Sequence, residues 1–302
     1  HDYLLKPLNP AQVRDSLSQA QAVFSAPKNA DASGVKQHIS TAVIGTRGGV
    51  GASTLATSLA WLFSADNGLP TALLDLDIHF GTGALSLDLE PGRGLTDAIE
   101  NPSRIDGLFI ERAMIRANDN LAILSAEAPI NTPLMTDGAA FVQLEEEFRQ
   151  AFEMTVIDMP RNMLINFPQL MNDVNVAVVV TELTLASARD SIRILSWLKS
   201  NAPHLQSIVV ANKVQPALAE ISRADFEASI ETRVDLVVPY DIKAASNAAK
   251  LGQTFADANR ASKAGGAIRD LAKMVLARHD AAEAPVGSGK KSLLGKFDLK
   301  AM

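Results

Sequence analysis

The sequence contains no cysteine, so disulfide bonds, thiolate catalysis, cysteine-ligated zinc and iron–sulfur clusters are all excluded. Its five histidines are scattered without the spacing that metal ligands show. No apolar run reaches the roughly 20 residues that a membrane-spanning helix needs. Positive charge is also short: the net charge of −6 does not favour broad binding to nucleic acid. The 302 residues, 47% of them hydrophobic, suffice for one large α/β domain with an appendage.

A further absence lies in the glycine-rich segment Gly45–Thr54, which reads G-T-R-G-G-V-G-A-S-T. The apolar run 39–44 before it predicts a buried strand, and the run 53–64 after it predicts a helix. A strand, a glycine-rich turn and a helix N-terminus form an anion site, because backbone N–H groups and the helix dipole face it. A phosphate-binding loop ordinarily ends in Gly-Lys-Ser/Thr. Ala52 stands where that lysine is expected.

From residue 38 onward, apolar runs alternate with helical patterns. Continuous Val-rich runs predict an α/β fold with a doubly wound, mainly parallel sheet covered on both faces. Such sheets bind ligands beyond the carboxyl ends of their strands. An acidic run within one helix, Glu145–Glu147, is interpreted as a solvated face. The predicted strands are 39–44, 71–76, 121–124, 154–157, 176–180, 207–210 and 236–238, and the predicted helices are 53–64, 95–100, 107–110, 138–152, 185–200, 222–230, 244–251 and 261–278.

Carboxylates stand at the ends of two predicted strands. Asp75 and Asp77 end the strand 71–76, and strand alternation sends them to the same side, where they can hold magnesium-bound water or orient an attacking water. Alone, such a pair more often caps the next turn. Asp158 ends the apolar run 154–157 in a Walker B pattern, whose carboxylate reaches magnesium, usually through water. One such aspartate is a weak signal, whereas the glycine-rich turn and the carboxylates, at the ends of three successive strands, reinforce one another.

Asn212 and Lys213 follow the late strand 207–210, a place where an Asn-Lys pair in P-loop proteins often faces the nucleobase. An asparagine amide can pair both a donor and an acceptor with adenine. Pro239, followed by Tyr240 and Asp241, ends the last strand and is expected to pack along the base. Plain loop residues remain the alternative reading of both segments.

These features, in this order, resemble the MinD/ParA group of P-loop ATPases, and within it most closely the pilus-assembly proteins called CpaE or TadZ. The resemblance spans residues 38 to 278 and implies ATP or ADP with Mg²⁺ as the ligand. It is carried by the segments 47–54, 75–81, 87–95, 158–160, 181–190 and 211–214.

The resemblance also assigns roles around the phosphates. Ser53 would coordinate magnesium, Asp158 would be the Walker B carboxylate, and Thr54 would touch the α-phosphate. The residues whose backbone would wrap the phosphates are Gly48, Gly49, Val50, Gly51, Ala52 and Ser53.

Asp77 would position the attacking water or a switch, with support from Asp75. Arg47 occupies the place of a lysine that, in the wider group, reaches across a dimer to the partner's nucleotide. Arginine keeps the charge and offers a planar fork that suits phosphate oxygens. Ala52, in contrast, cannot touch the β- or γ-phosphate. We therefore expect ATP binding to persist and hydrolysis to be slow or absent, unless Arg47 compensates in a dimer.

The chain divides into four predicted parts. Residues 1–26 resemble the C-terminal end of a receiver domain, with an ordinary helix as the alternative, and residues 27–37 read as a linker. Residues 38–280 form the ATPase domain. Residues 281–302 are a basic tail, in which 290–302 are either an amphipathic membrane contact or a solvated segment.

The leading functional hypothesis is a nucleotide-dependent homodimer that localises and assembles a Flp/tight-adherence type IV pilus system. We expect it in the cytoplasm, at the periphery of the inner membrane or at a cell pole, without specific nucleic-acid binding. The first alternative is a partitioning or division-site ATPase, which predicts a lysine at position 52. The second is an interaction module with a vestigial P-loop. An iron–sulfur reductase of the same fold is excluded by the lack of cysteine.

Overall fold

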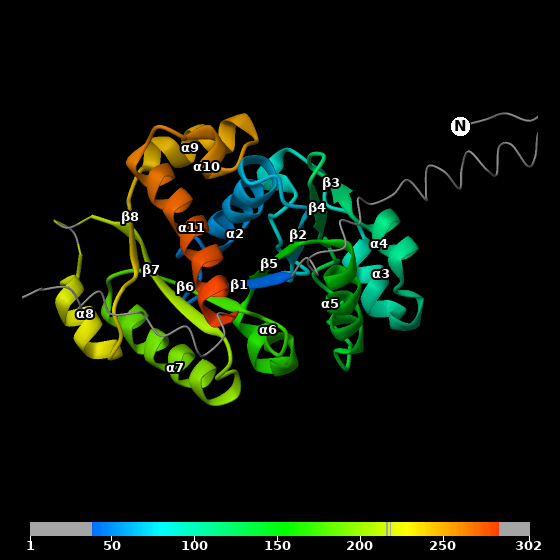
Figure 1. Ribbon diagram of the computed structural model, residues 1–302, viewed down its shortest axis with the longest axis horizontal. Coiled ribbons are helices and arrows are strands. Elements are labelled where there is room, and N and C mark those ends of the chain that lie inside the picture. The colour runs from blue at the N-terminus through cyan, green and yellow to red at the C-terminus, as the bar shows by residue number, and fades with distance from the viewer. Residues whose placement is uncertain (1–37, 216, 218, 284–302) are drawn as a thin grey trace, which may run out of the picture. The chain divides into compact units, whose positions relative to one another are not determined.

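The computed structural model describes residues 38–215, 217 and 219–283 (Figure 1). The predicted receiver-like segment 1–26, the linker 27–37 and residues 284–302 of the predicted tail lie outside the described residues. The last helix continues to Glu283, past the predicted domain boundary at residue 280. Within the described part of the chain, no helix is both long and apolar enough to cross a bilayer.

An eight-stranded sheet forms the centre of the domain, in the order β3-β4-β2-β5-β1-β6-β7-β8. Neighbouring strands run parallel, except that β3 is antiparallel to β4. From β1 at the middle the chain winds toward both edges, which confirms the predicted doubly wound, mainly parallel sheet. The strands are β1 (Ile39–Gly45), β2 (Thr71–Asp75), β3 (Ile115–Arg116), β4 (Leu121–Leu124), β5 (Met154–Met159), β6 (Val176–Thr181), β7 (Gln206–Val214) and β8 (Leu236–Pro239).

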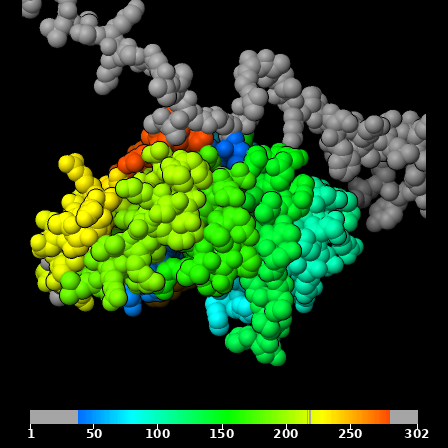
Figure 2. All heavy atoms as spheres, turned by 90° about the horizontal axis from the view of Figure 1, so that it is seen from below, coloured from blue at the N-terminus to red at the C-terminus, as the bar shows by residue number. Residues whose placement is uncertain are grey.

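Helices cover both faces of this sheet, which explains why a strand such as β6 is buried at every position. On one face, α2 and α11 pack through side chains that include Leu55 and Leu271, with α9 and α10 beside them (Figure 1). On the other, α3 to α8 pack through side chains that include Phe141, Ile194 and Phe226; Figure 2 looks onto this second face. The helices are α2 (Ala52–Trp61), α3 (Gly94–Glu100), α4 (Gly107–Ala113), α5 (Ala139–Ala151), α6 (Arg161–Asn166), α7 (Leu185–Asn201), α8 (Arg223–Ile230), α9 (Ile242–Leu251), α10 (Phe255–Ala258) and α11 (Lys263–Glu283).

All seven predicted strands are present, and the eight predicted helices correspond to α2–α5, α7–α9 and α11. β3, α6 and α10 were not predicted from the sequence, because their two, six and four residues are too few to show a period. The predicted helix 53–64 is interrupted, since α2 gives way to a π-helical turn at Leu62–Asp66. The interpretation of Glu145–Glu147 as a solvated face is wrong for Glu145, which is 8% exposed.

Candidate functional site

The segment Gly45–Thr54 forms a tight turn that joins the end of β1 to the start of α2. Gly49 and Gly51 have φ values of 80° and 92°, in the left-handed region that favours glycine. At Gly51 the surroundings also exclude a side chain, because a Cβ atom there would lie 2.5 Å from the amide nitrogen of Asn212. The strand, turn and helix thus follow one another as an anion site requires.

The N-terminus of α2 is not neutralised by residues of its own cap or first turn. No side chain caps it, and its first turn holds no acidic residue. N–H groups in the first turn of a helix have no intrahelical acceptor, and the helix dipole places partial positive charge there. This end of α2 therefore suits an anion. Ala52, its first residue, adds only a methyl group.

A cavity of about 590 Å³ lies over this turn, at the carboxyl ends of the parallel strands. Besides the turn itself, it is lined by Asp77 after β2, by Asp158–Asn162 at the junction of β5 and α6, and by Lys213 on β7. Its volume is in the range of ligand pockets. The structure thereby brings together the turn and the predicted residues Asp77, Asp158 and Lys213, but Asp75 does not line the cavity.

Asp158 is a buried carboxyl group, 6% exposed, that lines this cavity. Burial raises its pKa to about 7, the nearby carboxyl groups of Asp75 and Asp77 act in the same direction, and a hydrogen bond with Ser53 opposes them. A hydroxyl and a carboxylate are the oxygen ligands that Mg²⁺ takes, with water and phosphate in its remaining positions. The residues present therefore fit magnesium. No cluster of three or more acidic, histidine or cysteine ligands gathers among the described residues, so water and phosphate would have to complete the shell.

Asp75 and Asp77 hold the loop that follows β2. The strand ends at Asp75, so Asp77 lies beyond it and strand alternation does not set its direction. The Asp75 carboxylate is fully buried and accepts hydrogen bonds from the backbone N–H groups of Asp77 (3.1 Å) and Gly83 (2.8 Å). Burial raises the pKa of Asp75, while these hydrogen bonds lower it. The Asp77 carboxylate accepts from the N–H of Phe80 at 3.1 Å. In this structure both side chains cap the loop, the alternative left open above.

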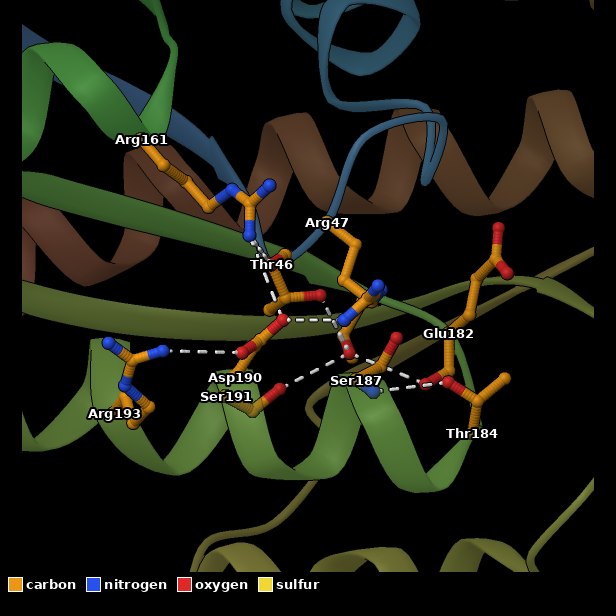
Figure 3. Close-up of polar contacts among 10 residues, drawn as sticks. Thr46, Arg47, Arg161, Glu182, Thr184, Ser187, Asp190, Ser191 and Arg193 are labelled. Carbon is orange, nitrogen blue, oxygen red and sulfur yellow. Dashed lines mark hydrogen bonds and ion pairs between the residues drawn. The ribbon is translucent and has the colours of Figure 1, made fainter.

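Arginines gather at the edge of the cavity (Figure 3). Arg47 donates to the Asp190 carboxylate on α7 at 2.9 Å. Arg161, the first residue of α6, lines the cavity, donates to the carbonyl oxygen of Thr46 at 2.9 Å and lies 3.7 Å from Asp190. Beneath them, the hydroxyl groups of Thr46, Thr181 and Ser191 form a buried chain. Arg161 was not predicted from the sequence as a site residue, although a cation directly after the Asp158-Met-Pro run was an available signal.

No protein-family model matches the chain. In sequence it is similar to a MinD-type septum site-determining protein of Guillardia theta, with 27% identity over 195 residues, which cover 64% of this chain and 70% of that protein. Among solved structures it is similar to a ParA-family ATPase from Chlorobium tepidum, with a TM-score of 0.71 and 16% identity over 79% of this chain and 98% of that one. It is also similar to the cell-division ATPase MinD of Pyrococcus furiosus, with a TM-score of 0.67 and 20% identity over 80% and 99% of the two chains.

The chain has a MinD/ParA-type P-loop fold.

Within this MinD/ParA-type fold, Asn212 and Lys213 face the P-loop backbone. Asn212 is 8% exposed, and its amide nitrogen donates to the carbonyl oxygen of Val50 at 2.8 Å. The Lys213 ammonium donates to the carbonyl oxygen of Gly49 and lies 3.5 Å from Glu182. Lys213 has a φ of 54°, a backbone conformation uncommon for residues other than glycine. Both side chains therefore brace the loop, and contact of this pair with a base remains a prediction.

Pro239 ends β8 and lines neither the P-loop cavity nor its neighbour. A second cavity, of about 370 Å³, lies next to Lys213 and is lined by Glu182, Val214 and Tyr240, among others. Asp241 caps α9 by accepting from the N–H of Ala244 at 2.9 Å. Of the segment 239–241, Tyr240 is thus the residue placed beside a cavity that adjoins the P-loop. The predicted contact of Pro239 with a base remains a prediction.

Proposed function

We propose that the chain binds Mg-ATP or Mg-ADP in the P-loop cavity and acts as a nucleotide-dependent dimeric scaffold that hydrolyses ATP slowly or not at all. The observation that carries this proposal is the methyl group of Ala52 in a loop that otherwise keeps its glycines and its uncapped helix start. The choice of ligand is supported by the similar MinD of Pyrococcus horikoshii, which was solved in complex with Mg-ADP. Its TM-score is 0.64, at 18% identity over 79% of this chain and 96% of that one.

Binding and turnover place different demands on the cavity. Main-chain N–H groups and the dipole of α2 hold phosphate in the ground state, and both are retained. The transition state of phosphoryl transfer needs positive charge close to the γ-phosphoryl oxygens. Loss of one charged donor typically lowers the rate by about 10²–10³. Ala52 therefore weakens hydrolysis more than binding.

The remaining residues take distinct roles in this proposal. Ser53 and Asp158 hold Mg²⁺, which supplies positive charge to the phosphates when bound. Asp77 positions the attacking water or acts in a switch. Its carboxylate already holds the following loop by accepting a hydrogen bond from the N–H of Phe80. Asp75 supports the same loop from the buried side through Gly83.

Arg47 acts between subunits in this proposal. In the single chain its guanidinium is held by Asp190, with the side chain 48% exposed. Release from Asp190 allows it to reach the phosphates bound by a second copy of the chain. The arginine fork suits phosphate oxygens better than a single ammonium does.

Calorimetry with and without Mg²⁺, together with the mass in solution with and without Mg-ATP, tests this proposal. We expect magnesium-dependent heat of ATP binding and a shift from monomer to dimer. Absence of association at millimolar Mg-ATP would contradict the proposal and leave an interaction module with a vestigial loop.

For the cellular role, we propose the localisation and assembly of a Flp/tight-adherence type IV pilus system, on the motifs that resemble CpaE and TadZ. A second candidate, partition of DNA or selection of the division site, is favoured by the similarity to MinD and ParA proteins. Filter binding of non-specific DNA at two salt concentrations separates a DNA partition role from the others, since binding through phosphates falls steeply with salt. Pili lost on deletion of the gene and restored by the intact gene would support the first role.

A further inference from the structure

Positively charged side chains from outside the P-loop gather beside it, around Asp190 on α7. The carboxylate of Asp190 lies 2.9 Å from Arg47, 3.7 Å from Arg161 and 3.7 Å from Arg193 (Figure 3). One carboxylate cannot neutralise three guanidinium groups. The cluster therefore keeps an excess of positive charge, and two of its arginines, Arg47 and Arg161, line the cavity.

The three arginines are not equivalent. Arg193 is 77% exposed and does not line the cavity. Arg47 lines the cavity but is committed to Asp190 through the short hydrogen bond. Arg161 lines the cavity, and its ion pair with Asp190 is long. Its Nη1 donates to the Thr46 carbonyl, whereas Nε and Nη2 form no hydrogen bond within the described residues. Arg161 thus has donors to spare and a side chain that is 45% exposed.

The sheet order brings Arg161 to the same cavity as Ala52, which stands at the position of the missing lysine. β5 is the direct neighbour of β1, and Ile44 pairs in register with Met159. The connection from β5 to α6 therefore leaves the sheet beside the start of the P-loop. Ala52, at the start of α2, and Arg161, at the start of α6, line the same cavity.

We propose that Arg161 supplies part of the positive charge that Ala52 lacks, by contacting the β-phosphate oxygens of the bound nucleotide within the same chain. The inference rests on the proposed nucleotide binding. The planar guanidinium presents several N–H donors in a fork that matches phosphate oxygens. In exchange for the phosphate, Arg161 gives up a backbone carbonyl and a long ion pair.

Two substitutions separate this role from a structural one. Arg161→Gln removes the charge but keeps a donor for the Thr46 carbonyl, and Arg161→Lys keeps the charge. Binding of a fluorescent ATP analogue, ADP and AMP is measured with Mg²⁺ for each variant. We expect Arg161→Gln to weaken ATP and ADP about 10- to 100-fold, the loss typical of a hydrogen bond to a charged group, and to change AMP little. Arg161→Lys should retain most of the affinity.

Arg193→Gln is the matched control, because Arg193 faces the same Asp190 from outside the cavity; its affinities should equal those of the wild type. Adding Ala52→Lys to Arg161→Gln should recover ATP binding, which a purely structural defect would not allow.

Unfolding without nucleotide shows whether each variant is folded. If Arg161→Gln does not fold, the comparison of Arg161→Lys with Arg161→Met replaces it. If the wild type binds and the charge-free variant matches it, the inference is overturned while the proposed function stands. If the wild type does not bind Mg-ATP at all, the proposed function itself fails.

Discussion

Asp158 and Glu145 are both buried carboxyl groups, yet they lie in unlike surroundings. Burial is the leading cause in each case, raising the pKa of Asp158 to about 7 and that of Glu145 to about 8. Asp158 lines the P-loop cavity and shares a hydrogen bond with Ser53. Glu145 faces the core from α5, where its Oε1 has no hydrogen-bond partner in the described part of the chain.

A raised pKa alone therefore does not identify a functional site. Buried carboxyl groups have a desolvation cost wherever they are, and strongly shifted values occur both in binding sites and elsewhere. The two sites differ in the interactions that can offset this desolvation cost. Asp158 has the hydroxyl group of Ser53 and a cavity beside it that can admit a cation. For Glu145, Asp173 raises the pKa further and Arg149 only partly offsets it.

The largest expected effect is on the Glu145 side of this comparison. The pKa of the folded state, about 8, exceeds the ordinary 4.5, so the folded state favours the neutral acid. This contribution to stability is complete below pH 4.5 and is lost as the pH rises through 8. Glu145→Gln imitates the neutral acid at every pH. At pH 9 it should be more stable than the wild type by about 3–5 kcal/mol, at about 1.4 kcal/mol per pKa unit.

Urea unfolding at pH 5 and pH 9 measures this difference. Glu146→Gln is the matched control, since Glu146 lies on the exposed side of α5; it should change stability by less than about 0.5 kcal/mol. Equal stability of Glu145→Gln and the wild type at pH 9 would show that Glu145 finds water or a partner in solution.

The next effect concerns turnover at the P-loop. Ala52→Lys restores an ammonium beside the γ-phosphoryl position, and ATP hydrolysis should rise by about 10²–10³, or about 3–4 kcal/mol in the barrier. Ala52→Met is the control, because it adds length without charge and should not raise the rate. A rate that Ala52→Lys leaves unchanged would mean that another step, or Arg161, already sets the speed.

How far the sequence predicted this molecule differs between its regions. The sheet and most helices followed from buried Val-rich runs and from helical periodicity, and the P-loop followed from its glycines. Short elements such as α6 were not predicted, because six residues show no helical period, and the position of Arg161 at the start of α6 was therefore not predicted either. Glu145 was misassigned because an acidic run implies solvent, whereas the packing of α5 turns one of its three members inward. Strand alternation placed Asp75 and Asp77 on the same side, but β2 ends at Asp75, whose carboxylate accepts a hydrogen bond from the N–H of Gly83 in the following loop.

Asp158→Asn sharpens the comparison between the two carboxyl groups. Without nucleotide, both Asp158→Asn and Glu145→Gln remove a buried acidic group and should not destabilise the domain. With Mg-ATP at 100 times its Kd, wild type and Glu145→Gln should gain about 2.7 kcal/mol through ligand linkage. Asp158→Asn should lose most of that gain, because the amide is a poorer magnesium ligand than the carboxylate. Thermal unfolding with and without Mg-ATP measures the gain; a full gain in Asp158→Asn would remove Asp158 from the proposed magnesium site.

The smallest expected effect is a difference in stability between substitutions at two glycines of the P-loop. Gly51 has a φ of 92° and no room for a Cβ atom, whereas Gly48 has an ordinary φ and nothing within 4 Å of an added Cβ. Gly51→Ala should lower the free energy of unfolding by about 1–3 kcal/mol through backbone strain and displacement of Asn212. Gly48→Ala should stay within about 0.5 kcal/mol of the wild type. Urea unfolding without nucleotide compares them. If both variants cost the same, the Asn212 amide does not hold the loop as the structure describes, and the left-handed turn at Gly51 is freer than its surroundings suggest.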